Sequence, residues 1–188
     1  MTPPVSSKCA TPLVTTSSSL LKIMHLNAQS CSNKALELAD TITDDSYDIV
    51  FLSETWFKEV GDEPRTTELT PPGFIFKSLH RKTGSGGGLA ILYRDSLAKY
   101  VTIRPESSTY TTFEMCEFHL SHHSRTLTFI FLYRPPPSKR NKLTTKVFIE
   151  EFQDLLDSHI STKDLFVIGD VNLHFDSENE TYAMLKMR

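Results

Sequence analysis

The chain has 188 residues, of which 39% are hydrophobic, and its formal net charge at pH 7 is −3. This length is sufficient for one α/β domain with a buried core. A protein that holds DNA by charge alone carries a strong basic excess, and 20 Lys and Arg against 23 Asp and Glu exclude that class. Any contact with nucleic acid is therefore expected to use local patches and a bound metal.

The termini and the cysteines indicate the compartment. Residues 1–19 are rich in Ser, Thr and Pro and lack the apolar stretch of a secretory signal, so a disordered leader is predicted there. No apolar run is long enough to span a membrane. The three cysteines, Cys9, Cys31 and Cys116, are odd in number and far apart, which is typical of a reducing compartment. The prediction is an intracellular protein, nuclear or cytoplasmic, without membrane or secretory partners.

The first structural unit is predicted to be a βαβ unit. Residues 20–27 and 48–54 are apolar runs that each end in a polar residue, as buried strands do. Between them, Ser32 or Asn33 offers an N-cap for a helix whose apolar face carries Leu36, Ala39 and Ile42. A crossover of this kind makes the two strands parallel.

Short strands and a second βαβ unit are predicted for the rest of the chain. The middle has no helical period between its short apolar segments, which favours antiparallel pairs at 74–79, 88–93, 99–104, 113–120 and 125–133. A helix is predicted over 144–160, with one stripe formed by Phe148, Phe152, Leu155, Leu156 and His159. Residues 164–170 form the next buried strand, so 125–133, this helix and 164–170 make the second unit.

Four predicted strands end in a residue that can do chemistry: Asn27, Glu54, Tyr133 and Asp170. A single polar residue at the end of a strand is common and does not indicate a site. Ligands of parallel βαβ units bind beyond the carboxyl ends of the strands, however, so four such residues together predict a site. Two carboxylates and an amide suit Mg²⁺, which prefers oxygen ligands. They also suit phosphodiester hydrolysis, in which a carboxylate activates water and neutral donors such as Tyr133 and Asn172 hold the phosphate oxygens.

Two other patterns resemble binding sites. The glycine-rich run 84–88 lacks the Gly-Lys-Ser/Thr of a phosphate loop and leads directly into a strand, so a hairpin turn is predicted. Its basic flank, 80–82, either contacts a DNA backbone or is a solvated loop. A zinc-like spacing joins Cys116, His119, His122 and His123. On an alternating strand Cys116 shares a face with Phe118 and Leu120 while His119 points the other way, which disfavours zinc.

The proline run after Tyr133 is surrounded by basic residues: Arg134, Lys139, Arg140 and Lys142. We expect an exposed loop that either follows phosphates beside the site or only keeps the protein soluble. Trp56, just after Glu54, either packs under the metal loop or contacts the substrate, and packing is the favoured interpretation.

Six ordered blocks carry a family resemblance: LKIMHLNAQS, DIVFLSETW, PPGF, RKTGSGGGLAILYR, LYRPP and LFVIGDVNLH. They resemble the endonuclease/exonuclease/phosphatase superfamily, and within it the apurinic-type endonuclease domain of vertebrate non-LTR retrotransposons (long interspersed elements). The resemblance covers roughly residues 20–176 and implies a four-layer α/β sandwich, incomplete at its C-terminus. The domain is thus expected at 20–176, after the leader, with a divergent tail at 177–188.

The resemblance also implies roles for the strand-end residues. Asn27 and Glu54 match the positions at the metal, Tyr133 the phosphate-contacting tyrosine, and Asp170 and Asn172 the pair that orients water and stabilises the transition state. Mg²⁺, with Mn²⁺ as a substitute, and DNA are the implied cofactor and partner. Val171 replaces the usual Phe, a small departure.

A larger departure lies at the end of the chain. The family has a later acidic residue and a terminal Ser-Asp-His motif, and this sequence ends at Arg188 without them; His174 does not take that place. The expectation is a Mg²⁺-dependent DNA endonuclease domain that is impaired by this loss. A non-catalytic or DNA-binding remnant and a phosphatase acting on a small ester are the alternatives. An unpaired sheet edge would also favour self-association.

Overall fold

The computed structural model describes residues 20–80, 86–105, 110–122, 124–138, 141 and 143–173. It contains two four-stranded sheets, with strand orders β1-β2-β4-β3 and β5-β6-β7-β8. The elements are β1 (Ile23–Asn27), α1 (Ala35–Asp44), β2 (Ile49–Ser53), α2 (Glu63–Leu69), β3 (Phe74–Leu79), β4 (Leu89–Arg94), the 3₁₀ helix η1 (Asp95–Tyr100), β5 (Val101–Pro105), β6 (Glu114–His122), β7 (Arg125–Tyr133), α3 (Thr145–Ser158) and β8 (Leu165–Asp170).

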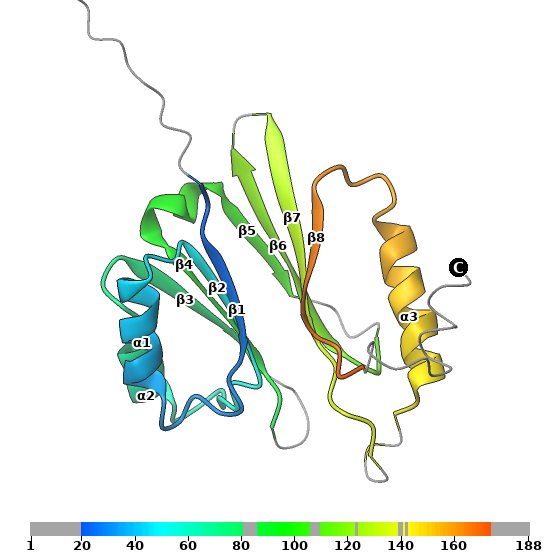
Figure 1. The fold of residues 1–188 in the computed structure, drawn as a ribbon, viewed down its shortest axis with the longest axis horizontal. Helices are drawn as coiled ribbons and strands as arrows, with labels where there is room; N and C mark the ends of the chain where they lie inside the picture. The colour runs from blue at the N-terminus through cyan, green and yellow to red at the C-terminus, as the bar shows by residue number, and fades with distance from the viewer. Residues whose placement is uncertain are drawn as a thin grey trace, which may run out of the picture.

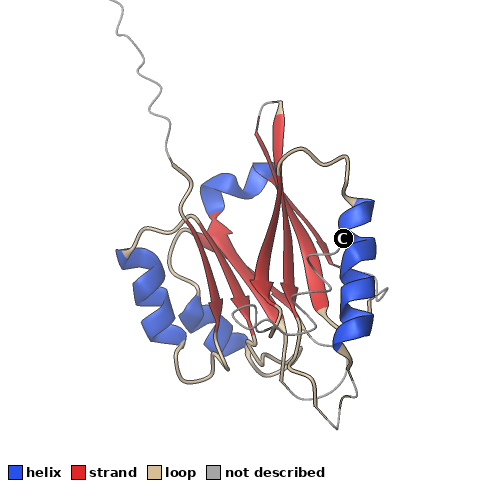
Figure 2. Ribbon diagram, turned by 45° about the vertical axis from the view of Figure 1, so that its right-hand side comes forward, coloured by secondary structure: helices blue, strands red, loops and turns tan. Residues whose placement is uncertain are grey.

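The layers are those of a four-layer α/β sandwich, which confirms the predicted fold class. The two sheets face each other, with α1 and α2 outside the first sheet and α3 outside the second (Figure 1). Figure 2 shows the strands of both sheets between the flanking helices. None of the helices in the described ranges is long and apolar enough to cross a membrane.

Both βαβ units are present. β1 pairs with β2 in parallel around α1, and β7 pairs with β8 in parallel around α3. The strands between them pair antiparallel, namely β2 with β4, β3 with β4, β5 with β6, and β6 with β7. The parallel pairs confirm the two predicted βαβ units, and the other pairs confirm that the segments between them are antiparallel; the partnership of β2 with β4 was not predicted.

Apolar side chains fill the three spaces between layers. Alternation along each strand sends one set of residues to the helices and the other to the opposite sheet. Aromatic rings dominate between the sheets, where Phe51 lies 5.0 Å from Phe131 and 5.6 Å from Phe118, centroid to centroid. The cysteine of the zinc-like pattern, Cys116, is buried in this inter-sheet core with Phe118 and Leu120, as predicted.

Two strands are less buried than predicted. β2 is buried throughout and β7 over its second half. In contrast, every residue of β1 and β8 is partly or largely exposed, with Phe166 at 47% and Val167 at 45%. The reason is position, because β1 and β8 are the end strands of their sheets and each has only one strand neighbour in the described structure.

Two details of the helices differ from the sequence-based expectation. The helix α1 begins after Lys34, without a side-chain cap, so neither Ser32 nor Asn33 is its N-cap. Its buried face carries Ala35, Leu38 and Ile42, whereas Leu36 is 64% exposed. The later start shifts the apolar stripe to the spacing i, i+3, i+7. The short helices α2 and η1 were not predicted, and η1 occupies the beginning of the strand expected at 99–104.

Candidate active site

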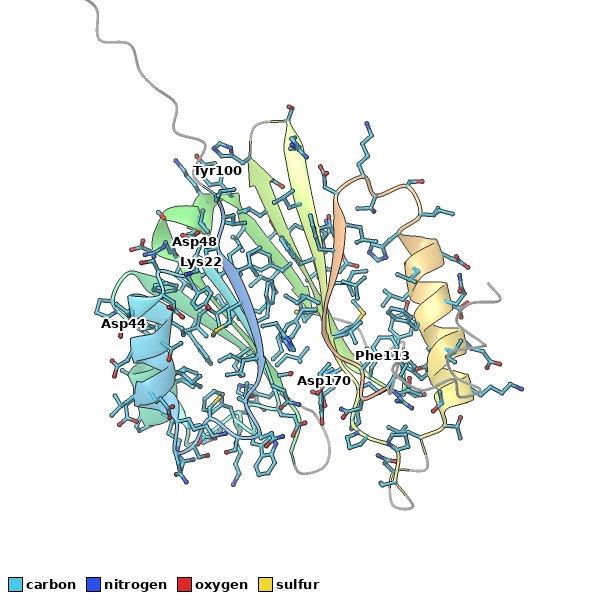
Figure 3. All side chains as sticks on the ribbon, viewed as in Figure 1. Lys22, Asp44, Asp48, Tyr100, Phe113 and Asp170 are labelled. Carbon is cyan, nitrogen blue, oxygen red and sulfur yellow. The ribbon has the colours of Figure 1, made fainter. Side chains whose placement is uncertain are left out.

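The candidate site lies at the edge where the carboxyl ends of four strands meet. Asn27 ends β1, and Glu54 directly follows β2. Tyr133 and Asp170 end β7 and β8 and are level with each other in the parallel register. Asp170 lies at the opening between the two sheets (Figure 3). The four strand-end residues are far apart in the sequence, and the fold brings all of them to one edge.

The side chain of Asn27 joins the two sheets. Its Nδ2 donates hydrogen bonds to Glu54 Oε1 at 2.8 Å and to Asp170 Oδ2 at 2.7 Å. Its Oδ1 accepts a hydrogen bond from the backbone N–H of Gln29 at 3.1 Å, which fixes the orientation of the amide. Two carboxylates are thus brought to one amide group, one from each sheet.

Tyr133 is a second partner of the Glu54 carboxylate. Its phenol is hydrogen-bonded to Glu54. Burial raises the pKa of Tyr133 well above its ordinary value, and the hydrogen bond to Glu54 and the negative charges of Glu54, Glu114 and Asp170 raise it further. The phenol is therefore neutral at physiological pH and can act as a donor without adding charge.

The backbone at Glu54 is held in an unusual conformation. Glu54 has φ +53, in the left-handed region that residues with a side chain rarely adopt. Its carbonyl accepts from Ser30 N at 2.8 Å, and the next residue, Thr55, donates from its backbone N to Gly88 O at 3.2 Å. Such conformations persist where the surroundings impose them, and they concentrate at functional sites. The left-handed conformation at Glu54 therefore ends the extended path of β2, and backbone hydrogen bonds on both sides hold it there.

Gly169 determines how closely β8 can approach β7 next to Asp170. It has φ +147, and a Cβ atom at this position would lie 1.8 Å from the carbonyl oxygen of Leu132. No side chain fits such a contact. Glycine is therefore required immediately before the carboxylate, which explains in physical terms the Gly-Asp pair at the end of this strand.

Asn172 is held beside Asp170 by two hydrogen bonds that it donates. Its backbone N donates to Asp170 Oδ1 at 2.9 Å, and its Nδ2 donates to the carbonyl oxygen of Arg134 at 2.7 Å. It has φ +46, again in the left-handed region. An amide carries two N–H donors; one of them is used by Arg134, and among the described residues the other has no partner, so it could serve a ligand.

Three residues near the site were missed by the sequence-based reasoning. Glu114 lies level with Tyr133 and accepts from Gly88 N at 2.8 Å. It begins β6, which runs antiparallel to β7, so the first residue of β6 reaches the same edge as the last residue of β7. Glu114 begins its strand, so the rule that site residues follow the ends of strands does not predict it.

His25 and Arg134 are the other two. The His25 ring lies 3.3 Å from Ser53 Oγ and edge-on to Phe131. Burial lowers its pKa, and the charge of Asp170 opposes that shift. Arg134 is fully buried, so the expectation that it belongs to an exposed basic loop is wrong. Its neighbours 139, 140 and 142 lie outside the described residues, as does His174.

The donor set fits a small divalent cation. Glu54 and Asp170 bring two like charges together, and a cation would relieve the repulsion between them. In the part of the chain that the structure describes, no three His, Cys, Asp or Glu side chains form a group that could hold a metal ion by themselves. Amide oxygens and water would have to complete the coordination, which is how Mg²⁺ is usually bound.

Trp56 and residues 86–88, the described part of the glycine-rich run, lie beside this edge. Trp56 is 49% exposed, so it does not simply pack under the loop. It has φ +59, and its backbone N donates to Gly87 O at 2.9 Å. A Cβ atom on Gly86 would lie 3.5 Å from the indole nitrogen, an ordinary van der Waals contact, so the indole packs beside this glycine. The Trp56 indole therefore offers a partly exposed aromatic surface, and hydrogen bonds hold the backbone that carries it.

The two described cysteines are poor candidates for chemistry. Burial raises the pKa of Cys31 and of Cys116 to about 12. Both thiols therefore stay protonated at physiological pH, and a thiolate nucleophile is not available from them.

Comparison with known proteins agrees with this geometry. Residues 24–181 match the Endonuclease/Exonuclease/phosphatase family. The solved structure of humanized D. rerio TDP2 with 14 mutations is 18% identical, with a TM-score of 0.55 over 88% of this chain and 66% of that chain. A Leptotrichia buccalis protein of the same family is 16% identical, with a TM-score of 0.59 over 89% of this chain and 74% of that one.

A retrotransposon domain is also similar in structure. The endonuclease domain of TRAS1, a telomere-specific non-LTR retrotransposon, is 14% identical, with a TM-score of 0.56 over 89% of this chain and 70% of that one. At these identities the likeness is one of fold. The chain spans about two thirds of the length of these structures. No curated protein sequence matches it. Because the matched span 24–181 takes in most of the chain, the protein belongs to the endonuclease/exonuclease/phosphatase family.

Proposed function

We propose that this domain hydrolyses phosphodiester bonds in DNA with the help of a divalent metal ion. The observation that carries the proposal is the Asn27 amide, which draws the Glu54 and Asp170 carboxylates together from two different sheets. A neutral phenol and a free amide donor lie beside them. This combination of acid, base and neutral donors suits a reaction at an anionic phosphate.

The roles divide as follows. Glu54 and Asn27 border the place where Mg²⁺, or Mn²⁺ in its place, would be held. When bound, the metal ion offsets the negative charge that develops on the phosphate. Asp170 orients the attacking water and accepts its proton. The water oxygen forms a bond to phosphorus while the bond to the leaving sugar oxygen breaks, and the leaving oxygen takes up a proton from solvent water. In the free site Tyr133 donates its single phenolic proton to Glu54; with the phosphate bound, that proton would turn to one non-bridging oxygen, and Asn172 donates to another.

DNA is the proposed substrate, and a retrotransposon endonuclease is the proposed origin. The TRAS1 endonuclease domain has this fold, and D. rerio TDP2 of the same fold has been crystallised with a single-strand DNA product. The six sequence blocks resemble the retroelement domains.

Nicking of supercoiled plasmid DNA tests the proposal. Relaxed circles are expected in Mg²⁺ or Mn²⁺ and none in EDTA. Glu54→Gln removes the charge that would hold the metal and is expected to abolish nicking. Glu37→Gln, on the exposed side of α1, is the matched control and should nick like the wild type. Equal nicking by the wild type and by Glu54→Gln would disprove the assigned chemistry.

Two alternatives are separated by the same preparation. The net charge of −3 gives little general attraction to a polyanion, which favours a small phosphate ester as substrate. Release of inorganic phosphate from such an ester, with intact plasmid, would establish a phosphatase. Binding of DNA that weakens as salt is raised, without hydrolysis of either substrate, would establish a binding module.

A further inference from the structure

Arg134 is the residue in the described structure whose burial is hardest to reconcile with its charge. It is 0% exposed, and burial lowers the pKa of its guanidinium. No carboxylate forms an ion pair with it among the described residues, and its Nε has no hydrogen-bond partner there. Burying an unpaired charge costs several kcal/mol in general, so the group must be retained for what it contacts.

The contacts of the guanidinium are to backbone carbonyls. Nη1 donates to Val171 O at 3.1 Å and to Asn172 O at 3.2 Å. Nη2 donates to Thr145 Oγ1 at 3.2 Å, at the beginning of α3. The planar group lies 4.7 Å from the ring centroid of Phe148. One side of the guanidinium therefore binds the first residue of α3, and the other binds the segment that follows β8.

The backbone of Arg134 grips the same segment. Its N–H donates to Asp170 O at 2.8 Å, and its carbonyl accepts from Asn172 Nδ2 at 2.7 Å. Arg134 thus contacts each of the three consecutive residues 170–172. Together, these bonds hold the left-handed backbone of Asn172, whose conformation would otherwise be unfavourable.

We propose that Arg134 is the positioning residue that aims the free amide proton of Asn172 at the substrate phosphate. The proposal rests on the proposed function of the site. A guanidinium suits this task because its rigid, planar fork reaches two carbonyls and a hydroxyl at fixed angles, whereas a lysine ammonium is a flexible point donor. Arg134 itself is fully enclosed and touches no substrate, so it acts through Asn172 and not as a catalytic residue.

The first test separates turnover from binding. Arg134→Lys keeps the charge and loses the fork, and it is expected to lower kcat about 10- to 100-fold with KM unchanged, as for other residues that orient a site from outside. Arg94→Met is the matched control. Arg94 lies over Phe74 and pairs with Asp48 at the opposite end of its sheet, so its loss should leave kcat unchanged. A kcat for Arg134→Lys equal to that of the wild type would overturn the proposal.

The second test is independent of activity. In nitrogen-15 NMR spectra, the side-chain amide of Asn172 is expected to give a pair of signals, of which the one from the N–H bonded to the carbonyl oxygen of Arg134 is shifted and protected from exchange in the wild type. In Arg134→Lys these signals should move to free-amide positions while those of Asn27 stay. Unmoved Asn172 signals would overturn the inference even if the wild type cleaves nothing. Conversely, a wild type without activity but with this NMR response would refute the proposed function alone.

Discussion

The side-chain nitrogen of Asn27 lies 2.7 Å from Asp170 Oδ2, although 143 residues separate them in the chain. The bond runs from the end of one sheet to the end of the other. Since the same nitrogen also donates to Glu54, it bridges two carboxylates that would otherwise repel each other. Removing or charging this amide therefore changes the electrostatics of the whole site.

Asn27→Asp places a third carboxylate between Glu54 and Asp170. The variant is expected to melt at a lower temperature than the wild type in EDTA, because the like charges repel. Mg²⁺ or Mn²⁺ should then raise its melting temperature more than that of the wild type, since the metal binds the folded state more tightly. Asn33→Asp, in the exposed loop before α1, is the control. An equal metal response in all three proteins would contradict the prediction.

Tyr133→Phe is expected to change the response to alkaline pH. The pKa of Tyr133 is raised by burial and by Glu54, so the folded chain holds the phenolic proton more tightly than the unfolded chain, where the pKa is about 10. This stabilisation is complete below that pH and is lost as pH rises toward the folded pKa. Denaturant unfolding between about pH 9 and 11 should show a steeper loss of stability in the wild type than in Tyr133→Phe. Burial also raises the pKa of Tyr93, but Tyr93 is present in both proteins and contributes equally to both curves. Parallel curves would therefore refute the raised pKa of Tyr133.

Gly169→Ala is expected to be among the most damaging single changes. Its Cβ atom would meet the Leu132 carbonyl oxygen at 1.8 Å, so β8 would have to separate from β7. We expect a loss of more than about 4 kcal/mol in the free energy of unfolding, or no folded protein at all. Gly61→Ala also has a positive φ, but nothing lies within 4 Å, and it should cost only about 1–2 kcal/mol. Chemical denaturation compares the two, and equal losses would count against the contact.

Trp56 is the only tryptophan of the chain and is half exposed, so its fluorescence reports on the site edge directly. We expect a single-stranded oligonucleotide, titrated in EDTA, to quench it by stacking a base on the indole. An abasic oligomer of equal charge should quench much less. Trp56→Ala should weaken binding by about 1–3 kcal/mol, and Trp56→Phe by less. Equal quenching by both oligomers would show that bases do not stack there.

The exposed edge of β8 is expected to promote self-association. Phe166 and Val167 are nearly half exposed on a strand that has only β7 as its partner in the described structure. Sedimentation velocity should show species larger than a monomer as concentration rises, and Val167→Lys should reduce them, because a charge at an edge strand opposes pairing. Ile160→Lys, exposed after α3, is the control. Monomers at all concentrations in the wild type would refute this.

The sequence predicted the strands, the two parallel pairs and the antiparallel character of the middle segments, because hydrophobic periodicity is a local signal. It did not predict which strands of the middle would be partners, such as β2 with β4. It also predicted which strand ends would meet, since parallel strands end at one edge. It could not predict Glu114 or the role of Arg134. Glu114 reaches the site only because β6 runs antiparallel to β7, and an arginine beside prolines resembles a solvent-exposed residue until the fold encloses it. Both depend on long-range packing.

The bond between Asn27 and Asp170 has a consequence for how the protein folds. Half of the site belongs to the sheet made first by the growing chain, and the other half to the sheet made last. Neither sheet can assemble the pair of carboxylates by itself. In a refolding experiment, recovery of hydrolysis should therefore lag behind the recovery of secondary structure and follow the docking of the two sheets. The rate at which the proposed hydrolysis recovers would then measure the rate at which the two sheets dock.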